Sequence, residues 1–191
     1  MGASHQVLIA IGGNQPFGGK PPEFLVQTAV SRLREAGFVV EAVSKTYRTP
    51  CFPKGAGPDY VNGAVRLTVA AEVSAQDVLS VLHQIEADNG RERIKRWGAR
   101  TLDLDLVAYD DLILPDAATF HHWLDLPMEE QLRIAPEELI LPHPRIQDRA
   151  FVLVPLADVA PDWHHPVLGQ TVRSLLAALS DQDRAEVREL T

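Results

Sequence analysis

Two aspartates separated by one residue are the pair in this sequence best suited to chemistry. Asp103 and Asp105 alternate with leucines in the run Leu102–Leu106. Residues two apart in a β-strand point to the same face, so the two carboxylates would project together while the leucines enter the core. A divalent cation would offset their repulsion, and Mg²⁺ prefers such oxygens combined with phosphate and water. Two solvated acids on an exposed strand face are the alternative.

A basic segment precedes the aspartates. Arg91–Arg100 holds five basic residues and one acid, in a chain whose formal net charge is −8. Guanidinium groups bind phosphate oxygens bidentately and stabilise charge on a leaving group, and Gly90 and Gly98 would permit a mobile lid. Beside the carboxylate pair, this segment favours polyphosphate transfer over a solvated loop that binds nothing.

The glycine-rich turn after the first apolar run is not a phosphate-binding P-loop. In Gly13–Pro21 the spacing is off by one residue, and a proline stands where Ser or Thr would bind Mg²⁺. The glycines still allow the backbone to approach a ligand or a neighbouring strand closely.

A segment rich in proline and aromatic residues is a candidate for binding a flat ligand. Tyr47–Phe52 and Pro58–Asn62 contain rigid prolines, and aromatic rings can sandwich a heterocycle. The Asn62 amide can offer a donor and an acceptor to its edge. An ordinary stiffened loop with Tyr60 in the core is the alternative. Further along, His143 lies between two prolines and could, with Arg149, address a nucleotide phosphate.

The hydrophobic pattern predicts one α+β domain over residues 1–191. Strands are expected at 7–11, 38–46, 61–69 and 102–109, with one helix between Pro22 and Gly37 and another from Ser74 to Asn89. This βαββαβ order is typical of a ferredoxin-like core, an antiparallel sheet with two helices on one face. Residues 114–138 are expected to form an insertion with a short helix, whose apolar residues face the core. A further helix is expected from residue 148 or 149, and a C-terminal helical extension at 171–179 and 181–190.

Composition limits the function classes. The net charge of −8 argues against broad binding to nucleic acid or to anionic membranes. A single cysteine, Cys51, excludes an intramolecular disulfide, and no stretch reaches membrane-spanning length. We expect a cytoplasmic monomer without nucleic-acid or membrane partners.

Taken together, the motifs resemble the 6-hydroxymethyl-7,8-dihydropterin pyrophosphokinase family of folate biosynthesis. The resemblance covers roughly residues 6 to 165. It rests on Tyr47–Pro50, Asp59–Asn62, Gly90-Arg91, Arg96–Asp105, Pro142-His143 and Arg149–Phe151.

The resemblance implies transfer of pyrophosphate from ATP to the pterin hydroxymethyl group, which releases AMP. Asp103 and Asp105 would hold two Mg²⁺ ions, and Arg91 and Arg100 would be the catalytic cations. The implied ATP contacts are His83, Glu86, Arg93, Trp97, His143 and Arg149, although His83 stands where the family often has Gln. The implied pterin pocket is formed by Thr49, Pro50, Phe52, Tyr60, Asn62 and Phe151.

Two other functions suit the same pattern. A nucleotidyltransferase or cyclase on a ferredoxin-like core would also use paired aspartates, but would cleave at the α-phosphate and have no use for a pterin loop. A non-catalytic regulator of the same fold would bind a small molecule without turnover. The fold alone does not separate the three.

Overall fold

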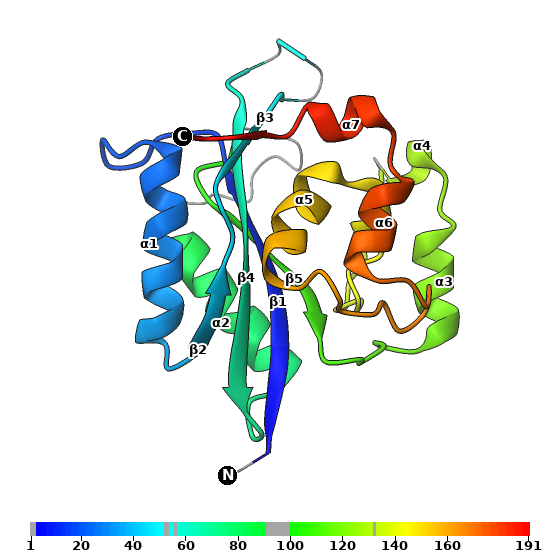
Figure 1. The fold of residues 1–191 in the computed structure, drawn as a ribbon. Helices are drawn as coiled ribbons and strands as arrows, with labels where there is room; N and C mark the ends of the chain where they lie inside the picture. The colour runs from blue at the N-terminus through cyan, green and yellow to red at the C-terminus, as the bar shows by residue number, and fades with distance from the viewer. Residues whose placement is uncertain (1–2, 52–53, 56, 91–99, 132) are drawn as a thin grey trace.

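The computed structural model describes residues 3–51, 54–55, 57–90, 100–131 and 133–191 (Figure 1). Its centre is an antiparallel sheet in the order β5-β1-β4-β3-β6, with β2 also pairing with β4. The architecture is therefore α+β, as expected. The strands are β1 (Ser4–Gly13), β2 (Val39–Val43), β3 (Tyr47–Thr49), β4 (Tyr60–Ala70), β5 (Asp103–Tyr109) and β6 (Arg188–Glu189).

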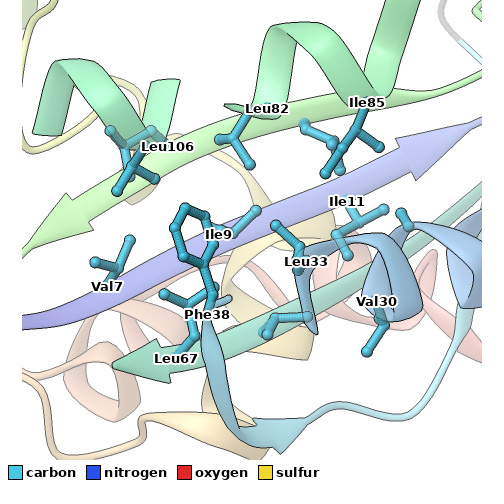
Figure 2. Packing of buried hydrophobic residues seen from close by; sticks show 14 of the residues in the cluster. Val7, Ile9, Ile11, Val30, Leu33, Phe38, Leu67, Leu82, Ile85 and Leu106 are labelled. Atoms are coloured by element: carbon cyan, nitrogen blue, oxygen red, sulfur yellow. The ribbon is translucent and has the colours of Figure 1, made fainter. Parts of the chain in front are cut away.

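Two helices cover one face of the sheet, α1 (Pro22–Glu35) and α2 (Ala75–Asp88). Prolines open α1, and a reciprocal capping box between Ser74 and Asp77 begins α2. Alternate residues of β1 point toward these helices, so the main core forms between the layers. Figure 2 shows Val7, Ile9, Ile11, Val30, Leu33, Leu82 and Ile85 in this core.

The opposite face of the sheet is covered by α5 (Ala150–Val159), which contacts β4. Leu8, Ala10 and Ala64 pack there with apolar residues of α5 in a second core. Because α5 is apolar on nearly all sides, it suits a buried position. It follows a short 3₁₀ turn, η1 (Ile146–Asp148), and packs against α6 (Val172–Ala178).

The 114–138 segment contains α3 (Ala117–Leu124) and α4 (Met128–Gln131). Asp116 caps α3 by accepting a hydrogen bond from the Thr119 amide. Phe120 and Leu126 are buried. The prediction that the apolar residues of this insertion face the core is therefore confirmed for these two side chains.

Two predicted elements end earlier than expected. The strand expected at 38–46 ends at Val43, because the Ser44 hydroxyl donates to the Lys45 carbonyl and accepts from the Ala64 amide. These bonds interrupt the strand, and β3 begins three residues after Ser44. The helix expected at 181–190 ends earlier, as α7 (Asp181–Ala185), and the chain continues into β6. The open edge of β3 offers backbone partners that a longer helix could not use.

Candidate functional site

Strand β5 presents Asp103 and Asp105 on the sheet face opposite the α1 and α2 layer. The leucines between and beside them enter the main core, as the alternation predicted. In the register with β1, Gly12 lies opposite Asp103 and Ala10 lies opposite Asp105. Residues directly opposite each other share a face, so both carboxylates have small cross-strand neighbours.

Arg100 forms an ion pair with Asp103. Its side chain is 27% exposed and that of Asp103 is 17% exposed. Burial acts to lower the pKa of Arg100, yet the charges of Asp103 and Asp105 outweigh burial and raise this pKa above its ordinary value. The guanidinium therefore stays charged beside the carboxylates, and a charged guanidinium can bind phosphate oxygens.

Asn62 lies on the same face, one strand further along the sheet. The register places it opposite Gly12, on the other side of β1 from the aspartates. Its amide nitrogen donates to the Thr49 hydroxyl at 2.7 Å, and both side chains are buried. A Cβ atom on Gly12 would lie 2.8 Å from the Asn62 Oδ1. The absence of a side chain at Gly12 therefore leaves room for the Asn62 side chain, which lies over Gly12.

Asn14 joins three loops of the site, and the sequence analysis gave it no role. Its side-chain oxygen accepts from the Arg100 amide at 2.9 Å, and its side-chain nitrogen donates to the Pro58 carbonyl at 3.1 Å. Its own backbone amide donates to the Arg100 carbonyl at 2.9 Å. The buried Asn14 thus fixes the β1–α1 turn to the end of the basic segment and to the proline-rich loop. The sequence signal that could have identified it is an asparagine directly after Gly12-Gly13, where β1 ends.

Asp105, His143 and Arg149 come together between β5 and the start of α5. The His143 amide donates to the Val107 carbonyl at 2.8 Å, which holds the 142–144 loop against β5. Burial, assisted by the charge of Arg149, lowers the pKa of His143 to about 3. The ring is therefore neutral near pH 7. Since its Nδ1 accepts from the Arg145 amide at 3.2 Å, we assign the ring proton to Nε2, which makes His143 a donor suited to a phosphate oxygen.

Two aromatic residues border the same face. Tyr60, the partner of Thr49 in the β3–β4 ladder, is half-buried. Burial raises the pKa of Tyr60, and the charge of Arg100 partly opposes this rise, which places the phenol within the electrostatic reach of the basic residue. Phe151 is 41% exposed, and the Arg149 guanidinium lies 5.8 Å from its ring centre. An exposed ring at this position is available to a flat ligand.

Glu86 supports β5 from α2. It is 1% exposed, and its Oε1 accepts from the Leu104 amide at 2.7 Å. Leu104 stands between the two aspartates, so this bond holds the outer edge of β5 in place. The half-buried His83 lies on the same helix. The ATP contacts expected of Glu86 and His83 stay predictions.

Four predicted site residues, Phe52, Arg91, Arg93 and Trp97, lie outside the described residues. Pro50 follows Thr49 and is half-buried. Within the described part of the chain, no group of three or more His, Cys, Asp or Glu side chains could hold a metal. Two carboxylates would suit Mg²⁺ that takes its other ligands from substrate phosphate and water. None of the helices in the described ranges is long and apolar enough to cross a membrane.

Comparisons with known proteins show the family of this chain. A family model described as 7,8-dihydro-6-hydroxymethylpterin-pyrophosphokinase (HPPK) matches residues 8–161. The chain is 40% identical over 173 residues to the 2-amino-4-hydroxy-6-hydroxymethyldihydropteridine pyrophosphokinase of Synechocystis sp., which covers 90% of this chain and 75% of the relative. It is 36% identical over 176 residues to the protein of the same name from Pseudomonas aeruginosa, which covers 91% of each chain.

Among solved structures, the chain resembles a Plasmodium falciparum HPPK-DHPS triple mutant with SDX-DHP. The TM-score is 0.65 at 14% sequence identity, and the match covers 98% of this chain and 48% of the solved one. The chain thus spans about half the length of that protein. At this identity the likeness concerns the fold alone.

Proposed function

The chain belongs to the 7,8-dihydro-6-hydroxymethylpterin-pyrophosphokinase family, and we propose that it transfers pyrophosphate from ATP to 6-hydroxymethyl-7,8-dihydropterin in folate biosynthesis. The observation that carries this proposal is the row Asp103–Gly12–Asn62 across three strands. It brings carboxylates suited to a metal–phosphate complex beside an amide suited to a heterocycle edge.

The acceptor pocket is proposed to lie around Asn62. The Asn62 amide nitrogen donates one hydrogen bond to the Thr49 hydroxyl, with 2.7 Å between the nitrogen and the oxygen. An asparagine amide has two donors and an acceptor with two lone pairs, so bonding capacity remains for the edge of a pterin ring. Tyr60 and Phe151 would contact the ring faces. The remaining members of the proposed pocket are Thr49, Pro50 and Phe52.

Asp103 and Asp105 are proposed to hold Mg²⁺, with two ions in the working complex. When bound, the metal would neutralise phosphate charge and stabilise the attacking and leaving oxygens. Arg100 supplies a fixed positive charge at the same place, and Arg91 is its proposed partner in catalysis. His143 and Arg149 would bind ATP from the α5 side. The other proposed ATP contacts are His83 and Glu86 on α2, and Arg93 and Trp97.

The proposed reaction is an in-line displacement at the β-phosphorus of ATP. The pterin hydroxymethyl oxygen forms a bond to the β-phosphorus and loses its proton, while the bond from the β-phosphorus to the α,β-bridging oxygen breaks. AMP leaves and the pterin diphosphate remains. The residues act by positioning the two substrates and by stabilising charge, which is how most phosphoryl-transfer sites work.

The remaining assignments also stay proposals. The core is proposed to be ferredoxin-like, which the order of β1, α1, β2, β4, α2 and β5 supports. The protein is proposed to act as a monomer, and in the cytoplasm. It is expected to need no nucleic-acid or membrane partner.

The identity of the adenine product tests the proposed function. The protein is incubated with ATP, Mg²⁺ and 6-hydroxymethyl-7,8-dihydropterin, and the nucleotides are separated by ion-exchange chromatography. We expect AMP in equal amount to a pterin diphosphate. Release of pyrophosphate or cyclic AMP would instead indicate a nucleotidyltransferase or cyclase, and pterin binding without turnover would indicate a regulator.

A further inference from the structure

The C-terminal residues form a strand along the outer edge of β3. In β6, Arg188 pairs with Arg48 and Glu189 pairs with Tyr47. The Leu190 amide then donates to the Thr46 carbonyl at 2.8 Å. Figure 1 shows this terminal segment leaving α7 and running across the sheet beside β3. Strand β3, whose Thr49 belongs to the proposed acceptor pocket, is therefore held on both sides, by β4 and by β6.

The position of β3 determines the proposed acceptor pocket. Thr49, its last residue, binds Asn62 through its hydroxyl and lies opposite Tyr60 in the ladder. β3 has only three residues, so without β6 it would be a very short edge strand with one open side. A shift of β3 would move the Thr49 hydroxyl and with it the orientation of the Asn62 amide.

Ion pairs hold the terminal segment at two points along the same region. Glu189 pairs with Lys45 at 2.7 Å, just before β3. Glu186 pairs with Lys54, which belongs to the loop between β3 and β4. The segment thus contacts the chain on both sides of the Thr49-Pro50 corner. Each exposed pair is weak alone, but together with the strand pairing they fix one geometry.

Contacts from α5 stabilise the same end of the sheet. The Asp158 carboxylate accepts from the Tyr47 hydroxyl at 2.8 Å and from the Lys45 amide at 3.1 Å. Burial, followed by the bond to Asp158, raises the pKa of Tyr47 well above its ordinary value, so the phenol stays a donor. Asp158 of α5 therefore fixes Tyr47 and the residues just before it, while β6 pairs with Tyr47 and Arg48 along the edge that β4 leaves open.

From these contacts we propose that residues 186–191 are a positioning segment for the pterin acceptor and determine its affinity, while ATP binding is independent of them. The inference rests on the proposed function. The segment lies beyond the family-model match, which ends at residue 161. The proposed ATP contacts His143 and Arg149 flank η1 at the start of α5, and β6 pairs with β3.

Deletion of residues 186–191 tests the inference through the split between the two substrates. We expect the KM for the pterin to rise by about tenfold, because small misplacements of binding groups are costly, while the KM for ATP stays within about twofold. Unchanged pterin KM, or an equal rise for both substrates, would overturn the inference. If the intact chain formed no AMP, the proposed function itself would fail, which is a separate result.

A charge exchange provides the second test and does not depend on the shortened chain folding. Lys54→Glu and Glu186→Lys should each raise the pterin KM by about threefold, and the double exchange should restore it. Arg173→Glu is the matched control, because Arg173 pairs with Asp162 at 3.4 Å in the same C-terminal region, and neither residue belongs to β3 or to the proposed acceptor pocket. Failure of the double exchange to restore affinity, or an equal effect of the control, would contradict the proposed role.

Discussion

Asp103 and Asn62 occupy one row across the sheet, with Gly12 alone between them. Since neighbouring strands lie about 4.8 Å apart, the backbones of Asp103 and Asn62 stand two strand spacings apart, on either side of β1. A phosphate chain held at Asp103 and a ring held at Asn62 would therefore lie beside each other on one face of the sheet. This is the geometry that a transfer between two bound substrates requires.

Gly12→Ala should impair the acceptor more than the nucleotide. The added Cβ would lie 2.8 Å from the Asn62 Oδ1, and the amide has little freedom because Thr49 holds its nitrogen. We expect the pterin KM to rise by about tenfold, while ATP affinity changes little. Gly63→Ala is the control, since its Cβ would meet its nearest neighbour, the Ser44 Oγ, at an ordinary 3.5 Å. Equal pterin KM values in both variants would show that the absence of a side chain at Gly12 is not needed.

The two aspartates should differ in stability although both are needed for turnover. Asp105→Ala removes one of two neighbouring like charges, so the melting temperature should stay unchanged or rise. Asp103→Ala also removes the ion-pair partner of Arg100, and we expect a loss on the order of 1 kcal/mol, since the pair is largely shielded from solvent. Both should lower kcat by more than about a hundredfold. Calorimetry and initial rates at saturating Mg²⁺ measure the two effects, and near-normal turnover of either variant would exclude the metal role.

Asn14 should couple the two halves of the site. Asn14→Ala loses the bonds to the Arg100 amide and to the Pro58 carbonyl, so both KM values should rise and the free energy of unfolding should fall by about 1–3 kcal/mol. Asn14→Asp keeps the acceptor for Arg100 and loses the donor to Pro58. Its effect should therefore concentrate on the pterin. If Asn14→Ala and Asn14→Asp had the same KM for each substrate, the bonds to Arg100 and to Pro58 would not have separate roles.

Acid should destabilise the folded chain before its carboxylates titrate. Burial lowers the pKa of His165 to about 4, and burial with Arg149 lowers that of His143 to about 3. Both values lie below the ordinary pKa of 6.5. The unfolded chain therefore binds more protons below that pH, and stability falls as pH decreases. Between pH 7.5 and 5.5 we expect a loss on the order of 1 kcal/mol per histidine in urea unfolding. A constant or rising free energy of unfolding would contradict these assignments.

Local patterns were enough to predict most of the core and the shared face of the two aspartates. The alternation of Leu102–Leu106 placed both aspartates on one face, because side-chain direction in a strand depends only on sequence parity. The row from Asp103 to Asn62 could not be predicted in this way, since it depends on the register of three strands that are distant in sequence. The β6 strand was missed for the same reason. Its residues favour a helix locally, and only the open edge of β3 makes a strand the better choice.

Phosphorus NMR of the reaction tests the central claim most directly. With ATP, Mg²⁺ and 6-hydroxymethyl-7,8-dihydropterin, resonances of AMP and of a pterin diphosphate should appear at equal rates in the natural chain. In Asp105→Ala both should be lost while the fold persists. Formation of ADP with a pterin monophosphate, or of free pyrophosphate, would mean that the site does not direct the pterin oxygen to the β-phosphorus, and would contradict the account.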